Sequence, residues 1–242
     1  MRIKCIVEYQ GTNYYGWQKQ VGQISIEEEI EKVLSQILNT PINIYASGRT
    51  DAGVHAKGQV FHFDIDKNVD LNRLKYSANM MLPEDINILS MEEVENEFHA
   101  RYAAKNKTYE YKILLKGKDP FNYKNAYLCP QELDIDLFEN ALKKFEGEHN
   151  FQNYTSKEED EQNFIRNISK IEVKKDGDLL SIKLTGNGFM RYMVRYIIGV
   201  SLVIASKKDP LSFINEPLDQ DKRHIVSYKA PAEGLYLLNV QY

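Results

Sequence analysis

The order in which strand-like and helix-like segments follow one another constrains the fold of this chain most. Residues 2–9 alternate between apolar and polar side chains, which is typical of a half-buried strand. A helical stripe begins at Ser25 and ends before Pro41. The elements predicted for the first half are, in order, strand 2–9, helix 25–38, strands 42–46 and 59–66, helix 70–81 and strand 86–94.

The second half repeats this order of elements without repeating the sequence. Its predicted elements are strand 107–115, helix 134–145, hairpin strands 166–175 and 178–185, helix 190–205 and strand 235–242. The order β-α-β-β-α-β is ferredoxin-like. We therefore predict an α+β fold of two ferredoxin-like halves, with mainly antiparallel sheets and helices on their outer faces. The predicted domains are residues 1–103 and 104–242.

Composition places the chain among ordinary globular proteins, because 43% of its 242 residues are hydrophobic and 27% are charged. Its two cysteines, Cys5 and Cys129, are too few for a disulfide framework or a four-cysteine zinc site. We expect buried thiols in a reducing compartment. Met1 leads directly into a strand-like run rather than a signal peptide, and the longest apolar run, residues 197–205, is too short to span a bilayer. The expected location is cytoplasmic, without a membrane partner.

The charges are unevenly distributed along the chain, although its net charge is only −4. Residues 99–128 contain seven lysines and arginines and two acids, a net charge of +5. Residues 179–208 contain five basic residues and no acid, which again gives +5. Two such segments can line one groove for a polyanion, although ordinary mixed surface charge gives the same count.

One nine-residue string, Ser47–His55, carries the strongest functional signal. Its sequence, Ser-Gly-Arg-Thr-Asp-Ala-Gly-Val-His, places the carboxylate of Asp51 in a loop bracketed by Gly48 and Gly53. A loop between two strands of a rigid sheet is a common place for a catalytic side chain. Taken alone, the pattern also fits an aspartate that only bonds the backbone of its own turn.

Further motifs accompany this string along the chain. They are Tyr9–Gln20, Phe98–Arg101, Lys107–Tyr111, Gly188–Arg195 and Ala232–Leu237. In this order they resemble the motifs of the TruA-type tRNA pseudouridine synthases over the whole chain. The resemblance implies the pseudouridine synthase fold, with an active-site cleft between its two halves. It also implies a homodimer that converts uridine to pseudouridine at positions 38, 39 and 40 of the tRNA anticodon stem-loop.

The resemblance assigns chemical roles to three residues. Asp51 is the expected catalytic nucleophile and Arg195 its ion-pair partner, while Tyr109 is expected to stack on the target base and move a proton. Arg191 and Arg195 lie four residues apart in a predicted helix, and therefore on nearly the same face. A carboxylate can either add to C1′ of the ribose or remove a proton from C2′, and the sequence leaves both routes open.

The residues expected to bind the substrate are Tyr109, Arg49, Arg101 and His55. The resemblance implies that the two arginines contact RNA or help to extrude the target base. For His55 an RNA contact and a structural role both remain open. Trp17, the only tryptophan, is expected in the core.

We expect no cofactor and no metal, because the isomerisation needs neither redox nor phosphate energy. The sequence has no Gly-rich dinucleotide motif, no P-loop and no His/Cys pair at metal-ligand spacing. Two other functions stay open. A non-catalytic RNA-binding module would also have ferredoxin-like halves with aromatic strands. A nucleoside or glycoside hydrolase usually needs a second carboxylate, which the Ser47–His55 string lacks.

Overall fold

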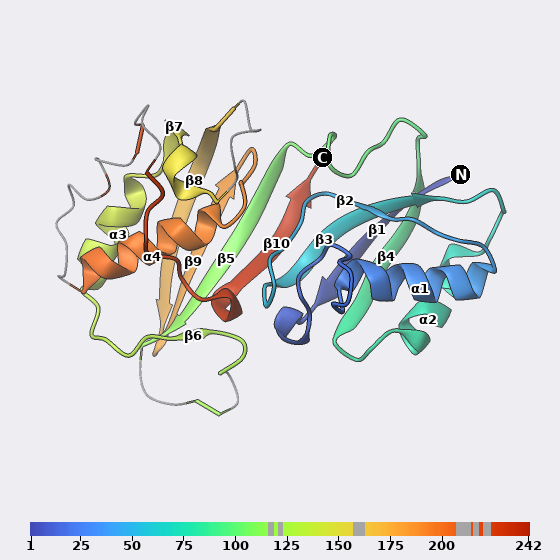
Figure 1. Ribbon diagram of the computed structural model, residues 1–242, viewed down its shortest axis with the longest axis horizontal. Coiled ribbons are helices and arrows are strands. Elements are labelled where there is room, and N and C mark those ends of the chain that lie inside the picture. Colours follow the sequence, from blue (N-terminus) through green and yellow to red (C-terminus); the bar gives the residue numbers. More distant parts are fainter. Residues whose placement is uncertain (116–118, 121–122, 157–162, 207–213, 215–217, 220–223) are drawn as a thin grey trace. The chain divides into compact units, whose positions relative to one another are not determined.

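The computed structural model describes residues 1–115, 119–120, 123–156, 163–206, 214, 218–219 and 224–242. The chain forms two compact units, one of residues Met1–Lys105 with Tyr236–Tyr242 and one of residues Asn106–Leu235. Within the described residues, each unit combines a mainly antiparallel sheet with two α-helices (Figure 1). The predicted α+β class is confirmed.

The first unit contains the predicted order of elements. Its strands are β1 (Arg2–Tyr9), β2 (Tyr45–Ala46), β3 (His55–Asp64), β4 (Ile86–Val94) and β10 (Leu235–Gln241), which belongs to this unit from Tyr236 on. Its helices are α1 (Ile26–Leu38) and α2 (Leu71–Met81), with a 3-10 turn η1 (Gly11–Asn13). Strand β1 pairs antiparallel with both β3 and β4, while α1 packs against α2 and α2 against β4 (Figure 1).

The alternation predicted for β1 is confirmed. Ile3, Cys5 and Val7 are all fully buried on one face of the strand, and the residues between them are half-buried. Burial raises the pKa of the Cys5 thiol well above its usual value, since a charged thiolate is poorly solvated there. Cys129 is also buried and free, as the sequence predicted.

Strand β2 is shorter than the predicted strand 42–46. Two backbone N–H groups that a strand would pair are taken by side chains of α1. The N–H of Ile42 donates to Ser35 Oγ at 2.9 Å, and the N–H of Ile44 donates to Glu31 Oε1 at 3.0 Å. The segment is therefore tied to the helix, and only its last two residues pair with β3.

Strand β10 pairs in parallel with the start of β3, where Tyr236 lies opposite His55 and Leu237 opposite Ala56. Gly58 permits this close approach, because a side chain there would collide with the carbonyl of Leu238. The C-terminal strand thus supports the strand that follows the Ser47–His55 string.

The second unit has a four-stranded antiparallel sheet in the order β5-β9-β8-β7. Its strands are β5 (Asn106–Leu114), β6 (Tyr127–Leu128), β7 (Gly147–Asn150), β8 (Ile165–Asp176) and β9 (Leu179–Gly186), with β6 parallel to β5. Its helices are α3 (Ile135–Lys143) and α4 (Met193–Ala205), with 3-10 turns η2 (Gln152–Tyr154) and η3 (Ala232–Gly234). Helices α3 and α4 pack on each other (Figure 1). The predicted hairpin of β8 and β9 is confirmed, whereas β6 and β7 were not predicted.

Helix α4 begins three residues later than the predicted helix 190–205. Tyr192 has φ 63° and ψ 0°, a left-handed conformation that cannot continue a right-handed helix. Arg191 therefore lies before the helix, and the prediction that Arg191 and Arg195 share one helix face is wrong.

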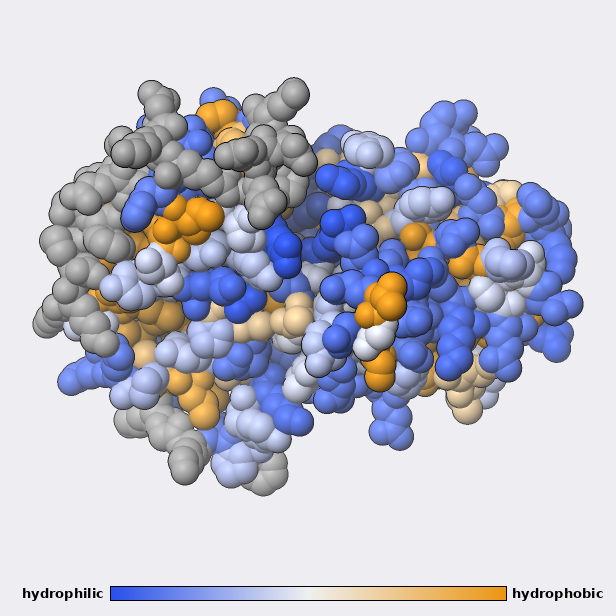
Figure 2. Space-filling model, in the orientation of Figure 1, coloured by the Kyte–Doolittle hydropathy of each residue, from blue (hydrophilic) through white to orange (hydrophobic). Residues whose placement is uncertain are grey.

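Polar side chains cover most of the face of the first unit that is visible at the right of Figure 2, with hydrophobic residues in small groups.

Trp17 is 1% exposed, with Tyr9 and Phe61 at ring-centroid distances of 6.0 and 6.1 Å, which confirms its place in the core. A search of the described residues found no helix long and apolar enough to cross a membrane.

Candidate active site

The Ser47–His55 string forms the loop between β2 and β3, and Gln59 of β3 fixes its first two residues. The fully buried hydroxyl of Ser47 donates to Gln59 Oε1 at 2.7 Å. The side-chain amide of Gln59 donates to the carbonyl of Gly48 at 2.8 Å. Gln59 is itself fully buried, so these bonds form away from water and hold the entrance of the loop firmly.

The first sequence motif, Tyr9–Gln20, packs directly against the backbone of this loop. Gly16 has φ 88°, and a Cβ on it would lie 2.5 Å from the carbonyl oxygen of Thr50. A Cβ on Gly11 would collide with the carbonyl of Val54. Both glycines are needed because no side chain fits between the two segments. The backbone N–H of Trp17 also donates to the Thr50 carbonyl, at 3.1 Å.

Side-chain exposure alternates along the middle of the loop. Arg49 is exposed, Thr50 is buried with its Oγ1 2.8 Å from Tyr9 Oη, and Asp51 is half-buried. The N–H of Val54 donates to the carbonyl of Asp51 at 3.1 Å, which closes a turn. Thr50 therefore anchors the loop while Asp51 is presented on a rigid turn.

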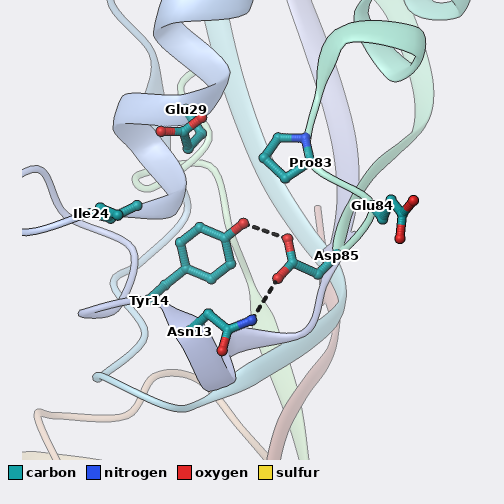
Figure 3. Close-up of a pocket in the computed structure, with 7 residues that line it drawn as sticks. All are labelled: Asn13, Tyr14, Ile24, Glu29, Pro83, Glu84 and Asp85. Atoms are coloured by element: carbon teal, nitrogen blue, oxygen red, sulfur yellow. Dashed lines mark hydrogen bonds between the residues drawn. The ribbon is translucent and has the colours of Figure 1, made fainter.

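A surface pocket of about 550 Å³ in the first unit is lined by Tyr14, which also contacts the loop. In Figure 3 the Tyr14 hydroxyl and the Asn13 amide both point to the carboxylate of Asp85, and both donate hydrogen bonds to it. The carbonyl of Tyr14 accepts a hydrogen bond of 3.3 Å from the N–H of Gly53. Burial, followed by the hydrogen bond to Asp85 and the charge of Asp85, raises the pKa of the Tyr14 phenol, so it stays a neutral donor.

His55 lies at the end of the string and is 1% exposed. Its Nδ1 accepts the N–H of Gly11 at 3.1 Å, so this nitrogen carries no proton. The imidazole ring stacks on Tyr236 of β10, with a centroid distance of 4.6 Å and an interplanar angle of 25°. These contacts join the first motif, β3 and β10 around one side chain.

Arg101 follows β4 and lies beside the exposed ring of Tyr102. Its guanidinium carbon lies 5.8 Å from the ring centroid of Tyr102, which is 77% exposed. The backbone N–H of Arg101 donates to His99 Nδ1 at 3.1 Å. Arg49 and Arg101 are thus both exposed cations of the first unit, available to an anionic substrate.

In the second unit, Tyr109 and Tyr111 lie two residues apart on β5. Tyr109 is half-buried, and its ring meets Phe189 edge to face at a centroid distance of 5.2 Å. Tyr111 is fully buried and its hydroxyl donates to the Pro231 carbonyl at 2.9 Å. Of the two tyrosines, Tyr109 is the one with accessible ring surface.

Arg195 lies in the first turn of α4 and is half-buried. Its Nε donates to the Ala230 carbonyl at 2.8 Å, and its own carbonyl accepts the Ala230 N–H at 2.9 Å. The side chain is therefore oriented by the segment that precedes η3.

The structure places Arg49, Asp51, His55 and Arg101 in the first unit, and Tyr109 and Arg195 in the second. Sequence reasoning missed the residues that position the loop, which are Gly11, Gly16 and Gln59. The two glycines stand in the first motif, but one sequence does not reveal which segment a glycine must approach.

Comparison with known proteins identifies the family of the chain. The sequence profile described as tRNA pseudouridine synthase matches residues 5–103 and 141–242. The chain is 38% identical to tRNA pseudouridine synthase A of Geobacillus sp. (strain WCH70), over 100% of this chain and 98% of that protein. It is 36% identical to tRNA pseudouridine synthase A of Streptococcus mutans, over 100% of this chain and 99% of that protein. With a matched profile and full-length relatives at this identity, the chain belongs to the tRNA pseudouridine synthase family.

Proposed function

We propose that this chain is a tRNA pseudouridine synthase that converts uridine to pseudouridine at positions 38, 39 and 40 of the anticodon stem-loop. The observation that carries the proposal is the Asp51 loop, in which buried bonds to Gln59 and Tyr9 fix the backbone while a carboxylate is presented. Two strands, β1 through Tyr9 and β3 through Gln59, thus hold the loop that presents the carboxylate. Family membership supplies the reaction.

The reaction is a rearrangement with balanced atoms. The bond from N1 of uracil to C1′ of the ribose breaks, the base turns, and C5 bonds to C1′. N1 then carries the proton that C5 loses. No electron leaves the substrate, so side chains that stabilise charge and move one proton suffice.

Asp51 is the proposed catalytic carboxylate. It adds to C1′ as a nucleophile, or it removes a proton from C2′; both routes need an ionised group close to the sugar. Arg195 is proposed to pair with Asp51, because a neighbouring guanidinium favours the ionised carboxylate. The bond of Arg195 Nε to Ala230 supports this role by orienting the guanidinium.

Tyr109 is proposed to stack on the uracil and to move the proton. Its half-buried ring, held edge to face by Phe189, offers a firm aromatic surface for an unstacked base. Extruding a base from its stack costs a few kcal/mol, which contacts from the exposed Arg49 and Arg101 would offset. His55 supports the Asp51 loop of the first unit by holding Gly11 and Tyr236.

We further propose a cytoplasmic homodimer, as the resemblance implies. Sedimentation equilibrium of the purified chain tests the dimer, and a single species of monomer mass at micromolar concentration would exclude it.

The test of the function is to incubate the chain with unmodified tRNA transcripts and map pseudouridine by carbodiimide treatment and primer extension. Wild type and Asp66→Asn, which alters an exposed carboxylate two residues after the end of β3, should both yield pseudouridine. Asp51→Asn should yield none. Absence of pseudouridine with wild type in every transcript that has uridine at positions 38–40 refutes the function.

The same experiment separates the two other functions. Release of free uracil from the tRNA would identify a hydrolase. Tight tRNA binding without any product would identify a binding module. Full activity of Asp51→Asn would support the proposed reaction but show that Asp51 is not its catalytic residue.

A further inference from the structure

Three cations surround one aromatic ring at the start of α4. Lys229 Nζ lies 4.0 Å from the ring centroid of Tyr192, and the guanidinium carbons of Arg191 and Arg195 lie 4.8 and 5.3 Å from it. Arg191 also donates from Nη2 to the Tyr192 hydroxyl at 3.0 Å. The side chains of Arg191 and Lys229 are exposed. We call Arg191, Tyr192 and Lys229 the Tyr192 cluster.

The backbone on both sides of this cluster is fixed. Gly199 of α4 lets the segment 228–230 lie directly on the helix, since a side chain there would collide with the Tyr228 carbonyl. The two hydrogen bonds between Arg195 and Ala230 fasten the same segment. Lys229 is therefore held over the ring by its neighbours in the chain, and the left-handed Tyr192 turns the ring towards it.

The two cations of the cluster lack an acidic partner within the part of the chain that the structure describes. Among the described residues, no carboxylate forms an ion pair with Arg191 or Lys229. Both charges lie within 5 Å of the same centroid, so they are at most about 9 Å apart and repel each other. The ring attracts both cations through its negative face, which holds them together despite this repulsion.

We propose that the Tyr192 cluster binds a backbone phosphate of the RNA substrate, held between Arg191 and Lys229. A phosphate that accepts one bond of about 2.8 Å from each cation reaches across up to about 8 Å, and the two cations are at most about 9 Å apart. An anion at this place neutralises two charges that no carboxylate of the described residues pairs with. The cluster adjoins Arg195, so this inference rests on the proposed function and adds a phosphate subsite next to the proposed catalytic arginine.

The ring of Tyr192 acts as a positioning group. Left-handed backbone is costly for a residue with a Cβ and persists where the surroundings demand it. Here the strained conformation presents the ring to three cations. Tyr192→Gly keeps the left-handed backbone without its strain and removes the ring together with its edge contact to Tyr196, so the melting temperature is measured beside the binding.

The experiment measures tRNA affinity by filter binding between 50 and 300 mM KCl, with an unmodified tRNA transcript. The double variant Arg191→Gln/Lys229→Gln should bind about 5- to 10-fold more weakly at 0.1 M salt, and its slope of log affinity against log salt should be smaller by about 0.7–0.9. The matched control is Lys174→Gln/Lys175→Gln, which removes the same charge from exposed positions of β8 and should change neither quantity. Tyr192→Gly should weaken binding at least about 2-fold with an unchanged melting temperature.

Each result decides the inference. An unchanged slope in the Tyr192-cluster double variant, or an equal loss in the β8 control, overturns it. Because binding is measured without product formation, failure of the subsite and failure of the proposed reaction give different results. If wild type forms pseudouridine and the double variant keeps the wild-type salt slope, the phosphate subsite is refuted while the proposed function stands. Replacing chloride by inorganic phosphate at matched ionic strength should not displace the tRNA, because a free phosphate lacks the other contacts of the polynucleotide.

Discussion

Gly16 lies so close to the backbone of Thr50 that a Cβ on the glycine would be 2.5 Å from the Thr50 carbonyl oxygen. This contact joins the first motif to the residue immediately before Asp51. The position of the proposed catalytic carboxylate therefore depends on a glycine 35 residues earlier in the chain.

Gly16→Ala should lower the free energy of unfolding by about 2–4 kcal/mol and reduce pseudouridine formation, because the loop must shift to admit the methyl group. Gly22→Ala is the matched control. Gly22 also has a positive φ, 75°, but open space surrounds it. Its replacement by alanine therefore introduces backbone strain but no steric collision. Urea denaturation and initial rates measure both effects. Equal losses in the two variants would show that only backbone strain matters.

Gln59→Met should destabilise the chain by about 2–3 kcal/mol and lower the reaction rate. The side chain keeps its volume, but the buried Ser47 hydroxyl and the Gly48 carbonyl lose their partner. Gln36→Met, at an exposed position of α1, should be neutral in both measurements. If Gln59→Met retains wild-type stability and rate, the buried bonds are not what positions the loop.

These supporting residues mark the limit of prediction from the sequence. The predicted strand 86–94 matches β4, and the predicted helices of the first unit begin at residues that the structure shows to be caps, with Ser25 Oγ accepting the Glu28 N–H and Asp70 Oδ1 accepting the Asn72 N–H. Such signals lie within a few residues of the element they define. The support of Gly11 and Gln59 for the loop depends on contacts between distant segments, which have no local signature.

The start of α4 was also not predictable from the sequence. The apolar pattern continues through residues 190–192, so periodicity predicts helix there, yet Tyr192 is left-handed. Tertiary contacts of the ring with Lys229 and Arg195 accompany this departure. The motif containing Arg195 was visible in the sequence, but the conformation that shapes its surroundings was not.

Acidification should weaken the first unit through His62. Burial, followed by the charges of His99 and Arg2, lowers the pKa of His62 to about 4 in the folded chain, while in the unfolded chain it stays near its ordinary 6.5. Between these values the unfolded state binds a proton that the folded state does not. The free energy of unfolding therefore falls as pH decreases from 6.5 to about 4, and this contribution is complete above pH 6.5.

The size of the effect at pH 5 should be about 1 kcal/mol after allowance for solvent screening. His62→Gln should reduce the difference in unfolding free energy between pH 7 and pH 5 by that amount. The glutamine can still accept the Ala100 N–H that His62 Nδ1 accepts at 3.2 Å. His224→Gln, which changes an exposed histidine, should leave the difference as in wild type. An unchanged difference in His62→Gln contradicts the assignment.

The proposed pair of Asp51 and Arg195 can be tested by a double-mutant cycle. Asp51→Asn and Arg195→Gln should each lower stability, and the double variant should lose about 1–3 kcal/mol less than the sum of the single losses, since the second change no longer breaks an intact pair. Arg195→Lys retains the charge but cannot reproduce the bond from Nε to the Ala230 carbonyl, so it should recover only part of the loss. Additive losses would show that the two residues do not interact.

The parallel pairing of β10 with β3 has a consequence for how the protein is made. His55 lies opposite Tyr236, so the edge of β3 beside the Asp51 loop finds its partner only after about 180 further residues have been synthesised. At 5–20 residues per second, this takes roughly 10–35 s on the ribosome. The first unit is thus the first to emerge and cannot be finished until the last strand leaves the exit tunnel, so a truncated chain lacks the strand that braces its proposed catalytic loop.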